Sequence, residues 1–180
     1  MAIDVAGALR RAGIEPALTT KVAPLPRAAA NDGSSATLAP LSSPFRHRIR
    51  VRYSECDLQG VVFNAHYLAY ADDAITELWR AAVEGGYQAM VAGGIDMVVA
   101  EAQLRFLAPA RFDDELDVEA TVTRLGNTGM TTILRMLKDS DLLVEVQLRH
   151  VFVDAGGAGK RPIPDPVRRG LAPHVEAQAA

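Results

Sequence analysis

The sequence holds very little cysteine and few aromatic side chains. Cys56 is the only cysteine in 180 residues, and phenylalanine, tryptophan and tyrosine together make up 6%. A single thiol excludes both a disulfide framework within the chain and a zinc site built from several cysteines. His47, His150 and His174 are spread singly along the chain. We therefore assign none of them to a metal, and the sequence predicts no cofactor.

Long apolar runs and an excess of charge of one sign are also missing. No run approaches the roughly 20 residues of a membrane-spanning helix, and Arg10-Arg11 is not followed by the apolar core of an export signal. The formal net charge of −3 gives no reason to expect binding to nucleic acid or to a membrane surface. The sequence predicts a cytoplasmic protein with one globular domain.

Residues 1–44 differ in composition from the rest of the chain. They contain no aromatic residue, and after a possible short helix (IDVAGALRRAG) prolines recur up to Pro44. We expect a flexible Ala/Pro-rich extension here, with a docking tail for a partner as the alternative. The main domain is expected over residues 45–165. Residues 166–180 then form a short tail, in which Asp165 could cap a last turn of helix that starts at Pro166.

From residue 45 on, the expected order is strand, helix and four strands. Residues 46–53 alternate, with arginines on one face and His47, Ile49, Val51 and Tyr53 on the other. Apolar residues at helical spacing predict a helix over residues 67–83. Four strand-like runs follow, at residues 96–110, 115–125, 130–139 and 142–154.

One long helix covering a curved five-stranded antiparallel sheet is an α+β architecture. A single helix leaves the edges of such a sheet open, and open edges pair readily with other chains. The pattern therefore predicts a homo-oligomer, most simply a two-fold dimer joined edge to edge, with a tetramer as the alternative.

Three segments resemble one known family. They are RYSECDLQGVVFNAHYLAY at residues 52–70, EAQLRFLAPARFDDELDV at 101–118, and LRHVFVD…KRPIPDP near the end. The chain is similar to the hotdog-fold acyl-CoA thioesterases of the 4-hydroxybenzoyl-CoA thioesterase family. The first segment, with its Asp-x-x-Gly loop between strand and helix, is the most specific. The resemblance implies a hotdog fold and an enzyme that hydrolyses an acyl-CoA, or an acyl carrier protein thioester, to a free acid.

The same resemblance implies roles for residues of the first segment. Asp57 falls on the family's catalytic carboxylate, which acts as general base or nucleophile. Gly60 matches the loop glycine, and Asn64 with Ala65 matches the helix entry, where backbone N–H groups stabilise the oxyanion. From spacing alone, a turn or capping aspartate before Gly60 is the better explanation of Asp57, and the resemblance reverses that preference.

Further residues are expected to contact the substrate. The family's tyrosine at the helix start corresponds to Tyr67, and Tyr67 and Tyr70 are predicted to line the acyl site together with residues of a second subunit. Asp72 corresponds to an acidic helix residue that meets the substrate hydroxyl in the hydroxybenzoyl type, and a solvated or dimer-facing carboxylate is the alternative. Possible partners for the CoA phosphates are Arg105, Arg124, Arg135 and Arg149.

Other reactive side chains near Asp57 are given supporting roles. Cys56 and Asp57 are neighbours, so in extended backbone they point to opposite sides. Ser54 lacks the Gly-x-Ser-x-Gly pattern of a serine hydrolase, and His66 is read as a surface histidine. Two other functions remain open: a non-catalytic acyl-CoA-binding lipid sensor on the same fold, and a hotdog dehydratase, which the lone Asp-x-x-Gly arrangement fits poorly.

Overall fold

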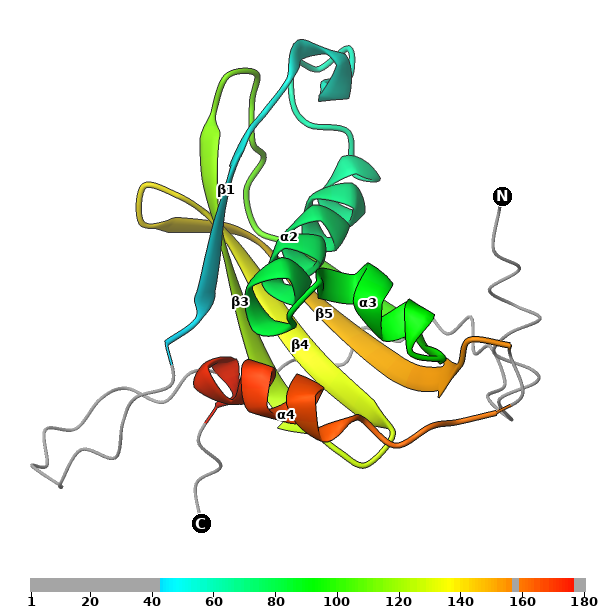
Figure 1. Cartoon of the computed structure of the whole chain (residues 1–180). Coiled ribbons are helices and arrows are strands. Elements are labelled where there is room, and N and C mark those ends of the chain that lie inside the picture. The colour runs from blue at the N-terminus through cyan, green and yellow to red at the C-terminus, as the bar shows by residue number, and fades with distance from the viewer. Residues whose placement is uncertain (1–42, 157–158, 177–180) are drawn as a thin grey trace, which may run out of the picture.

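The computed structural model describes residues 43–156 and 159–176, so all but the last two residues of the predicted extension lie outside it. Figure 1 shows a curved sheet crossed by one long helix. The elements in chain order are β1 (Phe45–Arg50), η1 (Tyr53–Glu55), α2 (His66–Ala82), α3 (Gly86–Ala92), β2 (Ile95–Phe106), β3 (Glu115–Leu125), β4 (Gly129–Lys138), β5 (Asp141–Asp154), α4 (Asp165–Leu171) and η2 (Ala172–His174).

The sheet has five strands in the order β1-β3-β4-β5-β2, and every neighbouring pair is antiparallel. Short connections join β3 to β4 and β4 to β5, because neighbouring antiparallel strands need only a hairpin between them. The helices lie on one face of the sheet, with α2 across its middle (Figure 1). The predicted α+β architecture, a long helix over a five-stranded antiparallel sheet, is confirmed.

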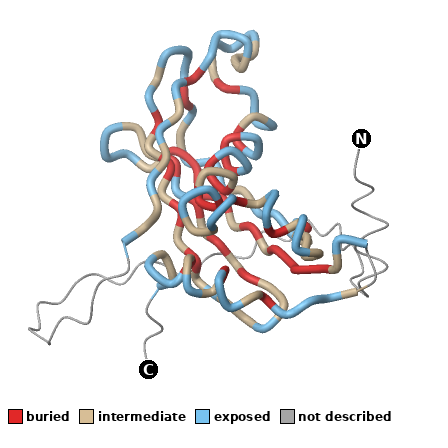
Figure 2. The backbone as a smooth tube through the Cα atoms, in the orientation of Figure 1, coloured by how far each residue is buried: buried red, intermediate tan, exposed pale blue. Residues whose placement is uncertain are grey.

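The core lies between α2 and the concave face of the sheet, where the buried residues are concentrated in Figure 2. The apolar stripe predicted for the helix is the buried one, because residues three and four apart share a helix face. On the sheet side, β3 buries alternate residues from Leu116 to Val122. The buried residues of α2 are Tyr67, Tyr70, Ala71, Ala74, Ile75, Leu78 and Trp79.

The outer face of the sheet carries a row of alternating charges across all five strands. In register from β1 to β2, the row runs Arg46, Glu119, Arg135, Glu145 and Arg105. Arg46 pairs with Glu119 at 2.8 Å, and Glu145 accepts from Arg135 at 3.1 Å and from Arg105 at 3.3 Å. Opposite charges directly across strands stabilise a sheet, so the charged side chains of this row are paired with one another across the strands.

Two local features differ from the sequence predictions. The first strand ends at Arg50, and Tyr53 belongs to the short η1 turn, where it is 81% exposed instead of facing the core. A second helix, α3, forms between the predicted helix and the second predicted strand, where no helix was predicted. Both depend on how the chain turns after a regular element, which alternation patterns do not describe.

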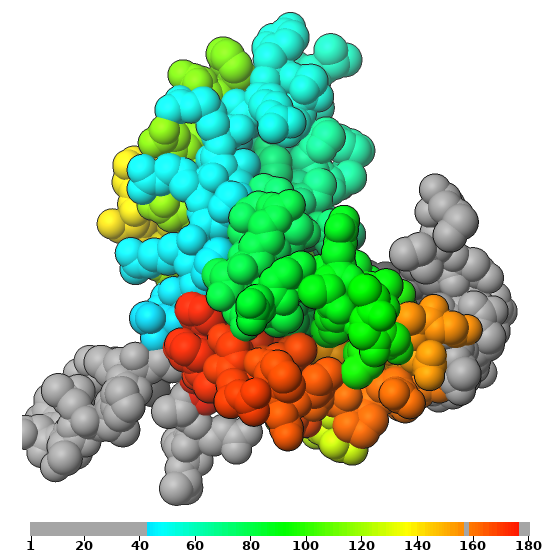
Figure 3. Space-filling model, in the orientation of Figure 1, coloured from blue at the N-terminus to red at the C-terminus, as the bar shows by residue number. Residues whose placement is uncertain are grey.

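The end of the described chain packs as a helix. In α4, Asp165 is the first helical residue, Pro164 is the N-cap, and Val167 and Leu171 are buried in the core. Figure 3 shows this segment lying against the end of α2. Gly170 approaches the end of α2 so closely that a Cβ there would lie 1.6 Å from the Ala82 carbonyl oxygen. Among the described residues, no helix is long and apolar enough to cross a membrane.

Candidate active site

Asp57 lies at the tip of a small hairpin formed by residues 55–63, which we call the loop hairpin. Its first residues pair with its last ones: Cys56 is bridged to Val62, and the Asp57 N–H donates to the Val61 carbonyl at 2.9 Å. The Gly60 N–H closes the turn on the Asp57 carbonyl at 3.0 Å. The loop hairpin therefore holds Asp57 in a defined place, half-buried, before α2 begins.

The Asp57 carboxylate also takes part in the turn itself. Its Oδ1 accepts the Gln59 N–H at 2.7 Å, which is the Asx-turn bond that favours aspartate at such positions. The second carboxylate oxygen has no partner among the described residues. Gly60 has φ of 73°, and a Cβ there would touch nothing within 4 Å. The left-handed backbone, and not a close neighbour, is what favours glycine at this position.

Backbone N–H groups without an acceptor in the described residues stand where α2 begins. Ala65 is the N-cap of the helix, and the His66 N–H donates to the Phe63 carbonyl at 2.9 Å. The N–H groups of Asn64 and Ala65 have no acceptor within the described ranges, and both residues are exposed. Free N–H groups at a helix N-terminus attract negative charge. The geometry thus offers an anion-stabilising pair at the end of the loop hairpin.

The two tyrosines of α2 are buried, and their hydroxyl groups are engaged within the chain. Tyr67 is 2% exposed, and its Oη accepts the Ala110 N–H at 2.9 Å. Tyr70 is 4% exposed, and its hydroxyl donates to Glu55 Oε2 at 2.6 Å. Burial raises the pKa of both phenols, and the bond to Glu55 raises that of Tyr70 further. Both side chains are therefore neutral hydrogen-bonding groups at any physiological pH.

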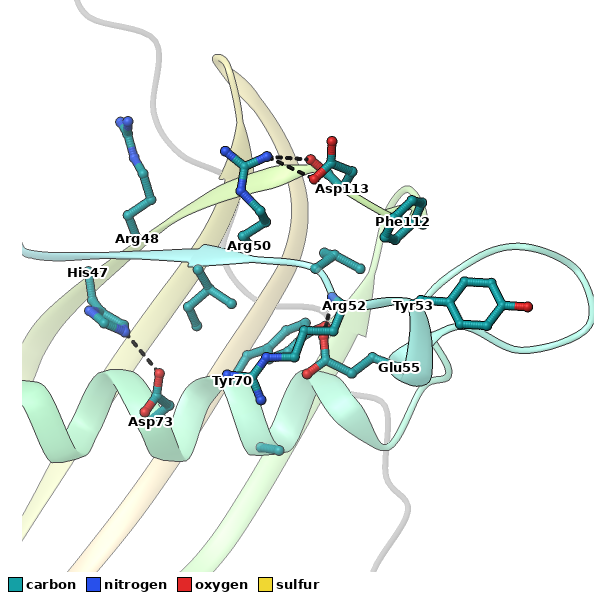
Figure 4. A pocket seen from close by; sticks show the side chains of 13 residues that line it. His47, Arg48, Arg50, Arg52, Tyr53, Glu55, Tyr70, Asp73, Phe112 and Asp113 are labelled. Carbon is teal, nitrogen blue, oxygen red and sulfur yellow. Dashed lines mark hydrogen bonds and ion pairs between the residues drawn. The ribbon is translucent and has the colours of Figure 1, made fainter.

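A cavity of about 730 Å³ opens between β1 and α2. Figure 4 shows Glu55 and Tyr70 on its wall, with His47 pointing across to Asp73, to which it is bonded at 2.9 Å. Arg52 reaches toward α2 in the same view. Neither Asp57 nor the helix entry lines this cavity. The cavity is thus separate from the carboxylate and N–H groups described above, although Glu55 belongs to both regions.

The remaining predicted residues lie apart from this constellation. Asp72 is exposed on α2, and its carbonyl accepts the Thr76 hydroxyl at 2.9 Å. Ser54 is exposed in η1, and Cys56 is half-buried beside the core. His66 begins α2 and packs edge-on against Phe63.

Three of the four arginines considered for phosphate binding form ion pairs with carboxylates. Arg105 and Arg135 both bind Glu145, whose side chain is 8% exposed, and Arg149 binds Glu101 at 3.1 Å. All three belong to the ion-paired outer face of the sheet. Arg124 is exposed and has no ion-pair partner in the part of the chain that the structure describes, so it is the arginine of this group that is available to an anion.

The sequence reading missed Glu55 and Ala110. Ala110 is fully buried and joins two structures: its N–H bonds to Tyr67, and its carbonyl accepts the Val62 N–H at 2.9 Å. For Glu55 strand parity gave no usable signal, because Glu55 lies in η1, beyond the end of β1, where the same parity fails for Tyr53. For Ala110 no signal existed, because its contacts use only the backbone.

Residues 51–171 match the thioesterase-like superfamily. An acyl-CoA thioester hydrolase, YbgC, from Escherichia coli O157:H7 is 32% identical over 121 residues, which are 67% of this chain and 90% of that protein. A 1,4-dihydroxy-2-naphthoyl-CoA hydrolase from Thermosynechococcus vestitus is 25% identical over 118 residues, covering 65% of this chain and 81% of that one.

A solved structure, the hypothetical protein TT1821 from Thermus thermophilus, superposes with a TM-score of 0.65 at 31% identity and covers 72% of this chain and 98% of that one. The sequence match spans most of the described domain, from the end of β1 through α4. The predicted hotdog fold and the predicted class of enzyme, a thioester hydrolase, are confirmed, and the chain belongs to the thioesterase-like superfamily.

Proposed function

We propose that this chain hydrolyses an acyl-CoA thioester to a free acid and CoA, with Asp57 as the reacting carboxylate. The observation that carries the proposal is the loop hairpin, which presents a carboxylate oxygen without a partner in the described residues. The loop hairpin leads directly into the helix entry, where the N–H groups of Asn64 and Ala65 are free of acceptors in the same described residues. A thioester needs little more than an oxygen nucleophile and a place for the oxyanion.

Two chemical routes use the same groups. In the first, Asp57 takes a proton from water, the hydroxide adds to the thioester carbonyl, and the C–S bond breaks to release CoA thiolate, which takes up a proton. In the second, a carboxylate oxygen of Asp57 attacks the carbonyl and expels the thiolate, and water then cleaves the resulting anhydride. In both routes the carbonyl oxygen becomes negative next to the N–H groups of Asn64 and Ala65, which stabilise it.

We place the acyl group over the apolar side chains that are exposed beside the start of α2. Phe106, at the end of β2, is 51% exposed and packs edge-on against Tyr67, and Phe63 is 49% exposed. Tyr67 and Tyr70 would then stand behind the reacting groups, because their hydroxyls are already bonded within the chain. Gly60 would leave open space next to Asp57. Asp72 would reach the substrate only if a second copy of the chain completed the site.

We further propose that two copies associate through β2. Of the two edge strands, β1 carries arginines that are paired with β3, whereas β2 and the following residue expose Val99, Phe106 and Leu107. Charged edges resist pairing and apolar edges invite it. The expected mass in solution is that of a dimer or of a pair of dimers. A monomeric mass at micromolar concentration, together with full activity, would contradict the proposal that a second copy of the chain contributes to the site.

Thiol release from a panel of acyl-CoAs tests the proposed activity. Aliphatic and aromatic acyl-CoAs are incubated with the wild type and with Asp57→Asn, and free CoA is followed with a thiol reagent. Asparagine keeps the oxygen that accepts from Gln59, so the turn survives while the charge is lost. We expect kcat to fall at least about a hundredfold. Undiminished thiol release by Asp57→Asn would refute the assignment, and binding of acyl-CoA without any release would indicate a sensor.

Turnover in ¹⁸O-labelled water tests for the second route. If Asp57 is the nucleophile and water opens the anhydride at the Asp57 carbonyl carbon, label enters the Asp57 carboxylate, and mass spectrometry of the Asp57 peptide detects it. If Asp57 is the base, or if water attacks the anhydride at the acyl carbon, the label appears only in the released acid. Asp57→Asn serves as the control for unspecific exchange.

A further inference from the structure

The first two turns of α2 are bonded to both sides of the loop hairpin. On one side, the Tyr70 hydroxyl donates to the Glu55 side chain at 2.6 Å. On the other side, Ala110 links the two elements: its N–H donates to Tyr67 Oη, and its carbonyl accepts the Val62 N–H, both at 2.9 Å. The tyrosines are three residues apart, so they leave the same face of the helix. The loop hairpin is thus held to α2 at two points.

Glu55 joins the two ends of the loop hairpin as well. Its backbone carbonyl accepts the Phe63 N–H at 2.9 Å, and Phe63 directly precedes the helix entry. Glu55 precedes Asp57 by two residues in the sequence. One residue therefore connects the segment that carries the carboxylate, the segment that carries the free N–H groups, and the helix itself.

We propose that Tyr70 and Glu55 are positioning residues for the reaction, and that their hydrogen bond sets the place of the Asp57 carboxylate relative to the N–H groups of Asn64 and Ala65. This inference rests on the proposed function. Neither side chain needs to touch the substrate. A displacement of about 1 Å between reacting groups can cost a hundredfold in rate, so a bond that fixes their relative position matters for turnover.

The bond has the features of a strong and permanent contact. The donor is 4% exposed, and the acceptor oxygen also receives the Arg52 N–H at 2.7 Å. Hydrogen bonds to an ionised carboxylate are shorter and stronger than neutral ones. Because burial and the neighbouring carboxylate both raise the pKa of Tyr70, the phenol keeps its proton and stays a donor over the whole working range of pH.

A matched control exists elsewhere in the fold. The Tyr87 hydroxyl donates to the carboxylate of Asp96, and that side chain also accepts the Met97 N–H. Tyr87 belongs to α3, which follows the carboxyl end of α2, whereas the loop hairpin precedes its amino end. Loss of this second tyrosine–carboxylate bond affects stability without moving Asp57.

Steady-state kinetics with the best acyl-CoA of the panel test the proposal. The variants are Tyr70→Phe, Glu55→Ala, Glu55→Gln, the Tyr70→Phe/Glu55→Ala double variant, and Tyr87→Phe, with rates expressed per mole of folded protein. We expect Tyr70→Phe and Glu55→Ala each to lower kcat about tenfold or more, with KM changed less than about twofold. The double variant should be no slower than the slower single variant, because both changes remove the same bond between Tyr70 and Glu55. Glu55→Gln, which still accepts from the tyrosine, should recover part of the loss.

Three results would overturn the proposal: an unchanged kcat in Tyr70→Phe, losses that multiply in the double variant, or an equal loss in Tyr87→Phe. Combining Tyr70→Phe with Asp57→Asn gives a second readout that does not depend on small changes in stability. If Tyr70 acts through Asp57, it should add no further loss in that background. An inactive Asp57→Asn beside a fully active Tyr70→Phe would end this inference and leave the proposed function standing. An active Asp57→Asn would end both.

Discussion

His150 makes the stability of this fold depend on pH in a way that can be measured. The side chain lies in the core face of β5 and is 1% exposed, and its Nδ1 has no hydrogen-bond partner in the described residues. Its cross-strand neighbours are Met130 on β4 and Val99 on β2, neither of which can stabilise a charge. Burial therefore lowers the pKa of His150 from its usual 6.5 to about 4.

The direction of the effect follows from proton binding. Between these two pKa values the unfolded chain binds a proton at His150 and the folded protein does not, so acidification favours unfolding. The stability that depends on a neutral His150 is fully present above pH 6.5. As the pH falls, the free energy of unfolding decreases by about 2 kcal/mol at pH 5 and about 3 kcal/mol at pH 4.

Urea denaturation at pH 7, 6, 5 and 4.5 measures this loss against a suitable control. In His150→Leu the titrating group and its unpaired nitrogen are both gone, while the carboxylates that also titrate in this range remain. The difference in unfolding free energy between the two proteins should therefore change by about 2 kcal/mol between pH 7 and pH 5. Parallel pH profiles for wild type and His150→Leu would refute the reasoning.

Substitutions at two further positions, Gly170 and Asn64, give sharp outcomes. Gly170→Ala should lower the free energy of unfolding by about 3 kcal/mol in a thermal or urea melt, because the new Cβ would meet the Ala82 backbone. At an exposed helix position the same change would instead raise the free energy of unfolding by about 1 kcal/mol. Gly156→Ala, whose Cβ would lie 3.5 Å from its nearest neighbour, is the control. Asn64→Ala should keep kcat within a few-fold in the thiol-release assay, since the N–H remains, whereas Asn64→Pro removes that N–H and should lose about a hundredfold. Equal activity of the two Asn64 variants would contradict a backbone oxyanion site.

The regular elements of this fold are the part that its sequence predicts well. The stripe of apolar residues that begins at Tyr67 became the buried face of α2, and the alternating run at residues 115–125 became β3 with its inner residues buried. These predictions succeed because period 3.6 and period 2 are properties of the backbone, and one buried face is enough to select them. The turn at Asp57 and Gly60 is equally local.

What the sequence did not predict depends on how the chain turns after a regular element and on contacts between distant residues. Tyr53 has the parity of a core residue, yet η1 turns it outward. The prediction that Tyr67 and Tyr70 line the acyl site also did not include the bonds that their hydroxyls make within the chain. The partner of Tyr67 is Ala110, 43 residues away, and no local pattern in the sequence relates the two.

By itself the sequence determined the strands, the long helix and the turn that carries Asp57, because each follows from the spacing of residues within about 20 positions of one another. Tertiary structure alone decided which groups hold that turn in place. Those contacts use backbone atoms and buried hydroxyls from separate elements, brought together only when α2 packs on the sheet. The proposed reaction needs both levels: a carboxylate that the sequence displays, and a position for it that only the packed fold provides.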